Sequence, residues 1–242
     1  MNEVSVLLIG FLLGIRHATD PDHLAAVATL AIRRHSLAQS VRQGVAWGIG
    51  HTVVLVVGGS IVLAFGSSIP HGIATALELV VAGMLIALGV DVLRRLVRER
   101  KHVHVHTHEG GIRHVHAHSH ATAHRAAHDH EHTHAGGIPW RALAIGMTHG
   151  MAGSAGLIVL SLGAVQSWKT GVAFIALFGA GSIVGMATLS IAIAIPLRIT
   201  AAHLGNLFNG LAAAIGGLSC ALGLLIICRI GYFQAIGIEH NF

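Results

Sequence analysis

Two histidines and two aspartates lie within seven residues near the start of the chain: His17, Asp20, Asp22 and His23. In a helix, His17, Asp20 and His23 share one face because they are three residues apart. Imidazole with carboxylate suits divalent nickel, cobalt, zinc or manganese, whereas copper(I) favours sulfur ligands. The pattern therefore predicts a site for a divalent transition metal. The alternative is a proton relay, or a buried ion cluster with Arg16.

Three more titratable residues interrupt apolar stretches: His51, Glu78 and His149. Inside a membrane such side chains face a cavity or a protein partner rather than lipid. We expect His51 and His149 to bind metal or carry protons, with a simple hydrogen bond between helices as the alternative. Glu78 is expected either to orient a ligand histidine or to carry protons.

Histidine is concentrated in one polar segment. Residues 102–134 hold 13 of the 21 histidines, in alternating runs such as His102-Val103-His104. The composition predicts a disordered segment that binds metal loosely and at many points. The alternative is a polar linker. Such a segment could buffer incoming ions, sense their load or deliver them to an export path.

The rest of the chain is strongly apolar. Of its 242 residues, 53% are hydrophobic and 10% are charged, which indicates an integral membrane protein and excludes disorder or a coiled coil as its overall class. Membrane topology accounts for the net charge of +5, so we expect no nucleic-acid partner. Cys220 and Cys228 lie in one apolar run, which excludes a disulfide framework.

Six apolar runs are long enough to cross a bilayer, which takes about 20 helical residues. They are 4–32, 45–65, 73–93, 142–165, 172–197 and 204–228. The first contains Pro21, which lacks a backbone donor and disfavours helical geometry at Asp20. We therefore expect a broken first helix, with the break facing the protein interior because lipid cannot satisfy the freed backbone groups.

Lysine and arginine are unevenly distributed between these spans. Residues 33–42, residues 94–141 and Arg198 carry twelve of the 15, whereas Lys169 and Arg229 fall on the opposite side. Since cytoplasmic loops carry the excess of positive residues, the twelve predict the cytoplasmic side. Both termini would then lie outside the inner (plasma) membrane, and the histidine-rich loop would lie in the cytoplasm.

The two halves of the chain resemble each other. A shift of 132 aligns residues 14–17 (Gly-Ile-Arg-His) with 146–149 (Gly-Met-Thr-His), and a shift of 131 aligns residues 47–51 (Trp-Gly-Ile-Gly-His) with 178–182 (Phe-Gly-Ala-Gly-Ser). The agreement predicts a duplication of three helices. Because three is odd, the second copy would be inverted, as in many secondary transporters whose substrate sites lie between the repeats.

The predicted fold is therefore an all-α integral membrane protein of about six helices in a 3+3 inverted repeat. Residues 1–98 would form the first repeat, 99–140 the disordered loop and 141–242 the second repeat. The break at Pro21 would correspond to residues 153–154 (Gly-Ser) in the second copy.

Three motifs together resemble one known family. Residues 16–23 read Arg-His-Ala-Thr-Asp-Pro-Asp-His, which fits the signature Arg-His-Ala-x-Asp-x-Asp-His of the nickel/cobalt transporters. Residues 50–54 (Gly-His-Thr-Val-Val) resemble the second motif of that family, and residues 148–155 (Thr-His-Gly-Met-Ala-Gly-Ser-Ala) resemble its urease-accessory permease branch. The resemblance implies nickel or cobalt as the transported substrate and a route through His17, Asp20, Asp22, His23 and His51.

We therefore expect a permease that passes nickel(II) or cobalt(II) into the cytoplasm. In this hypothesis the first motif replaces the hydration waters of the ion, His51 adds a ligand or gate, and His149 completes the site from the other repeat. The histidine-rich loop is also similar to that of nickel and cobalt efflux proteins, so efflux with the loop as collector is an alternative. A membrane metal sensor or metalloenzyme that does not transport is another.

We do not expect an enzyme. An intramembrane protease has little support because the chain lacks His-Glu-x-x-His, and a thiol-carrying membrane reductase would need cysteines on corresponding helices of both repeats, whereas both cysteines lie in one span. We expect no cofactor, since the metal is the cargo. The expected partners are the divalent metal ion and the lipid bilayer, with a cytoplasmic metallochaperone or urease or hydrogenase maturation proteins as recipients of the metal.

Overall fold

The computed structural model describes residues 3–32, 36–65, 70–99, 105–107, 113–115, 139–151 and 167–235. The long helices there are α1 (Glu3–His17), α2 (Pro21–Ala31), α3 (Leu37–Phe65), α4 (His71–Glu99), α6 (Trp168–His203) and α7 (Gly205–Ala235). A further helical stretch covers residues 140–151. The predicted all-α membrane class is confirmed.

The helices account for most of the predicted spans. Among the described residues, α3, α4, α6 and α7 are each long and apolar enough to cross a membrane, and α1 with α2 makes a fifth, bent span. The stretch 140–151 begins the predicted span 142–165, the rest of which lies outside the described residues. The structure therefore supports a multi-pass protein.

The predicted break in the first span is confirmed. The axes of α1 and α2 differ by 55°, and Asp20 has the extended backbone expected before a proline (φ −61°, ψ 144°). The amide groups of Thr19 and Asp20 donate to the carbonyl oxygens of Arg16 and His17, at 2.9 and 3.1 Å. These backbone groups near the break are thus paired within the chain. Arg16, Thr19 and Pro21 are exposed, so the break does not lie wholly in the protein interior as predicted. The predicted counterpart at residues 153–154 lies outside the described residues.

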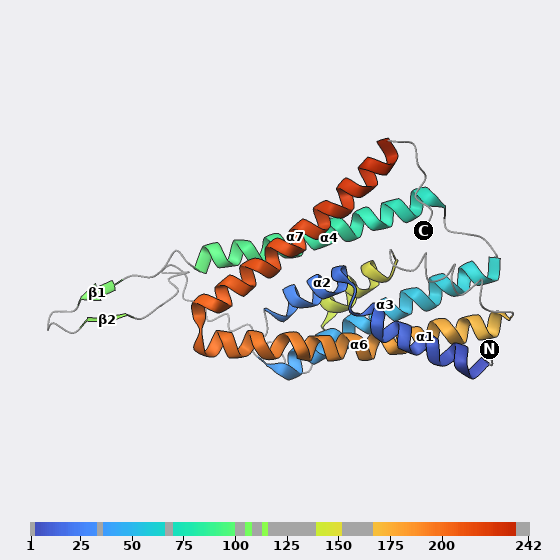
Figure 1. Ribbon diagram of the computed structural model, residues 1–242, viewed down its shortest axis with the longest axis horizontal. Helices are drawn as coiled ribbons and strands as arrows, with labels where there is room; N and C mark the ends of the chain where they lie inside the picture. The colour runs from blue at the N-terminus through green and yellow to red at the C-terminus, as the bar shows by residue number, and fades with distance from the viewer. Residues whose placement is uncertain are drawn as a thin grey trace, which may run out of the picture.

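The helices pack in pairs around α2. Figure 1 shows α1 and α3 each running alongside α6, α4 crossing α7, and α2 between these two sets. Residues 25–31 of α2 are all buried. The core cluster contains four of them together with Trp47, Leu85 and Met186: Ala25, Ala26, Val27 and Leu30. The bent end of the first span therefore lies at the centre of the helix bundle.

Glycine contacts relate the two halves. A Cβ added at Gly14 would meet the carbonyl oxygen of Phe178, and one at Gly146 would meet that of Trp47. These two contacts correspond under the shifts of 132 and 131 residues found in the sequence. The close approach of helix backbones that glycine permits thus occurs at equivalent places in both halves.

Further contacts repeat this correspondence. Gly50 approaches Leu143 as Gly181 approaches Phe11, and Gly48 approaches Ile183 as Gly179 approaches Thr52; in each case an added Cβ would press on the partner. Such reciprocity is expected of a duplicated unit. It supports the predicted repeat, while the inverted orientation of the second copy in a membrane stays a prediction.

The loop between the halves contains a short hairpin. Strand β1 (Val105–Thr107) pairs antiparallel with β2 (Arg113–Val115), with Val105 opposite Val115. Residues 99–140 were expected to be disordered, so this hairpin adds regular structure to that segment. Most of that segment, with most of its histidines, lies outside the described residues.

Candidate metal centre

The bend in the first span brings two histidines together. His17 ends α1 and His23 lies in the first turn of α2, and their ring centroids are 4.4 Å apart. The helix is interrupted between them, so the single helical face inferred from their spacing does not exist. The histidines meet because the chain turns at residues 18–20.

A third histidine comes from the neighbouring span. His51 of α3 is fully buried, and its ring centroid is 5.3 Å from those of both His17 and His23. One nitrogen from each of these three side chains lies within 4.8 Å of the others. The geometry thus provides a set of three imidazole nitrogens that could hold one ion; we call His17, His23 and His51 the histidine group.

A second set lies beside the first and shares one residue with it. His149, in the helical stretch 140–151, has its ring centroid 4.2 Å from that of His23. Asp22 joins the two: its carboxylate oxygens lie 2.7 Å from His149 Nε2 and 3.1 Å from His23 Nδ1. Asp22, His23 and His149 could also hold an ion, and we call them the mixed group.

The remaining predicted ligands lie at the edge. Asp20 Oδ2 lies 2.7 Å from His17 Nδ1, but the Asp20 side chain is 49% exposed and belongs to neither group. When His17 Nδ1–H donates its hydrogen bond to Asp20, the lone pair of His17 Nε2 is left to bind a metal. Glu78 lies in neither group.

The histidine group and the mixed group contain buried nitrogens without hydrogen-bond partners among the described residues. Within the described part of the chain these are His17 Nε2, His23 Nε2, His149 Nδ1 and both ring nitrogens of His51. Leaving a buried polar atom unpaired costs about 1–3 kcal/mol. Five such atoms in one place are expected where a ligand completes the structure.

Trp47 borders the clusters and was missed by sequence reasoning. Its fully buried indole ring lies 5.3 Å from that of His23 and 5.6 Å from that of His149, and its N–H has no partner among the described residues. An isolated tryptophan in an apolar span carries no signal that would distinguish it from packing.

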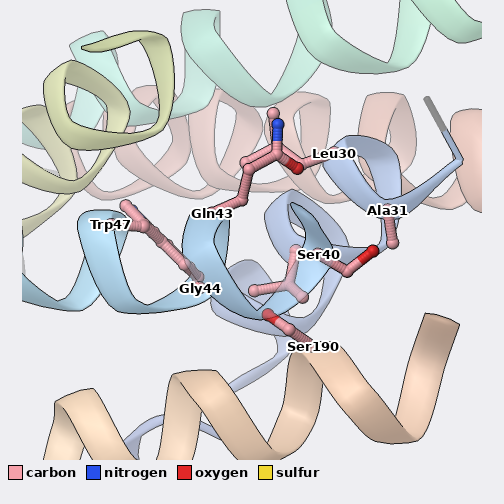
Figure 2. A pocket seen from close by; sticks show the side chains of 8 residues that line it. Leu30, Ala31, Ser40, Gln43, Gly44, Trp47 and Ser190 are labelled. Carbon is pink, nitrogen blue, oxygen red and sulfur yellow. The ribbon is translucent and has the colours of Figure 1, made fainter. Parts of the chain in front are cut away.

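Trp47 also lines a small pocket with Ser40, Gln43 and Ser190 (Figure 2). Its volume of about 10 Å³ admits at most one water molecule. Trp47 thus lies against His23 and His149 and also borders a mostly apolar space too small for a hydrated ion.

A larger cavity of about 210 Å³ adjoins the mixed group. Its polar lining residues are Asp22, Glu78, His149 and Arg229. Sequence reasoning counted Arg229 as a charge at the outer membrane surface and missed it as a site residue. In the structure α7 continues past the predicted end of the last span, and the exposed Arg229 also lines the cavity.

Comparison with known proteins identifies the family. No family model and no solved structure matches the chain. The chain is, however, 31% identical over 234 residues to the urease accessory protein UreH of Bacillus sp. (strain TB-90), an alignment that covers 96% of this chain and 95% of that protein. With the three motifs found in the sequence, this likeness shows that the chain belongs to the nickel/cobalt transporter family, in its urease-accessory (UreH-like) branch.

Proposed function

We propose that the protein carries nickel(II) or cobalt(II) across the membrane through the histidine group and the mixed group. The observation that supports this proposal is the set of five buried imidazole nitrogens without partners, gathered at the bend of a membrane span. A divalent ion that leaves water must replace its hydration shell. Imidazole nitrogens with one carboxylate suit nickel and cobalt better than the oxygen-seeking magnesium and calcium.

The two groups suggest how the ion moves. His23 belongs to both, so an ion can change from one set to the other without losing all its protein ligands. Asp22 orients His23 and His149 through its two oxygens, and Asp20 orients His17. In this mechanism Asp22 and the histidines bind the ion, whereas Asp20 positions a ligand.

We propose that transport is inward. The positive loops predict that the histidine-rich segment 102–134 is cytoplasmic and that both termini lie outside the plasma membrane. The segment would hold arriving ions until a metallochaperone or an enzyme-maturation protein takes them. The relative's description as a urease accessory protein favours a nickel-dependent client.

Cellular nickel content tests the function and its direction. Cells that express the intact chain are compared, at low external nickel, with cells that express the double variant His17→Ala/His51→Ala. His124→Ala serves as a matched control, because it removes one of 13 loop histidines. We expect more nickel with the intact protein and with His124→Ala. Less nickel would show export, and equal content in all cells would refute transport.

A further inference from the structure

The cavity beside the mixed group joins charged residues from several helices. Asp22 belongs to α2, Glu78 to α4 and Arg229 to α7, while His149 lies in the stretch 140–151. His149 is 1% exposed and Arg229 is exposed, so the cavity runs from the buried centre towards the surface of the bundle.

The size of the cavity suits a hydrated ion. At roughly 30 Å³ for each water molecule, about 210 Å³ accommodates several waters around an ion. The histidine group has no such space, because its side chains touch one another and His51 is fully buried. An ion that passes from the cavity to the histidine group therefore exchanges its waters for imidazole ligands in steps.

The lining of the cavity provides oxygen ligands and one opposing charge. Asp22 and Glu78 offer two carboxylates, and His149 carries a buried Nδ1 without a partner among the described residues. Arg229 places a permanent positive charge in the same cavity. Two carboxylates alone would hold a divalent ion strongly, and a nearby guanidinium weakens that attraction.

The geometry points to a second metal station in this cavity: a hydrated nickel(II) or cobalt(II) ion rests between Glu78 and Asp22, and Arg229 sets how tightly it is held. This inference rests on the proposed transport function. Glu78 is then a ligand in its own right, and Arg229 is a positioning residue that speeds release by repulsion. Asp22 and His149 link the station to the histidine group.

Opposite changes in apparent affinity test the station. The full chain is reconstituted in liposomes, a gradient of nickel alone drives flux, and a trapped nickel-sensitive dye reports entry. We expect Glu78→Gln to raise the KM for nickel about tenfold. Arg229→Gln should lower KM several-fold and also lower the maximal flux, because the ion leaves slowly. Arg229→Lys keeps the charge and should stay close to the intact protein.

The controls separate this inference from the proposed function. Glu3→Gln and Arg141→Gln are matched substitutions outside the cavity and should leave KM unchanged. If the intact protein carries no more nickel than empty liposomes, transport itself is refuted. The second station alone is refuted by a different result: the intact protein carries nickel and His51→Ala stops the transport, but the two cavity variants do not behave as expected. In that case Glu78→Gln and Arg229→Gln either leave KM within twofold or shift it in the same direction. KM does not depend on how much protein folds, so Glu78→Gln remains a test even if Arg229→Gln is unstable.

Discussion

The two halves of this protein are alike in packing and unlike in chemistry. Gly14 and Gly146 make equivalent close contacts, and His17 corresponds to His149 under the shift of 132. The next histidine has no such counterpart, since His51 corresponds to Ser182. Ser182 donates a hydrogen bond to the Gly14 carbonyl at 3.3 Å, whereas neither ring nitrogen of His51 has a partner among the described residues. The two halves thus share close helix packing, while most of the candidate metal ligands lie in the first half.

The largest difference in nickel flux should appear when the two corresponding residues His51 and Ser182 are each replaced by alanine. His51→Ala removes one of three nitrogens from the histidine group, and we expect nickel flux to fall at least about 100-fold, since losing even a residue that only orients a ligand costs 10- to 100-fold. Ser182→Ala removes one hydrogen bond worth about 1 kcal/mol and should keep flux within about twofold. Equal losses in liposome flux would show that both positions are structural.

The shared packing predicts equal destabilisation. Gly14→Ala and Gly146→Ala each press a methyl group on the backbone of a neighbouring helix, which typically costs about 1–3 kcal/mol. Both should lower the midpoint of thermal unfolding in detergent by similar amounts. Gly58→Ala, where an added Cβ meets nothing within 4 Å, is the control and should not lower it. A large difference between the first two would argue against the repeat.

Asp22 connects the halves, so replacing Asp22 should lower nickel flux more than replacing Asp20. Asp22→Asn weakens two histidine contacts, including the one to His149, and we expect flux to fall about tenfold. Asp20→Asn affects His17 alone from a half-exposed position and should reduce flux about threefold. The reverse order, measured as KM and maximal flux for nickel, would make Asp20 the ligand.

The smallest effect is expected at the aromatic pair that corresponds between the halves. Trp47 lies against His149, and its counterpart Phe178 lies against His17, at 5.6 and 5.2 Å between ring centroids. Trp47→Phe makes the halves alike and should keep flux within about threefold. It should remove most of the nickel-dependent fluorescence quenching, because Trp140 and Trp168 are exposed and Trp47 is the tryptophan whose ring contacts His23 and His149 among the described residues. Unchanged quenching would place the bound nickel elsewhere.

Several parts of the site could be predicted because they depend on local physics. Pro21 cannot continue a helix, so the break followed from its covalent structure. His51 and His149 stood out because polar side chains are costly in hydrocarbon. Other parts could not be predicted: Arg229 was counted only as a charge between spans, and Trp47 carried no signal of a site. In a membrane helix both lipid-facing and buried positions are apolar, so the sequence pattern shows weakly which face meets another helix.

The amino-acid sequence by itself determined the membrane class, the interrupted first span and the residue types that suit nickel or cobalt. These follow from hydropathy, backbone geometry and ligand chemistry, which are properties of short segments. Only the tertiary structure decided that His23 belongs to two groups, that Asp22 rather than Asp20 joins the halves, and that Glu78 and Arg229 share a cavity. Those relations depend on how each helix is rotated against its neighbours, and that rotation is set by contacts between residues far apart in the chain.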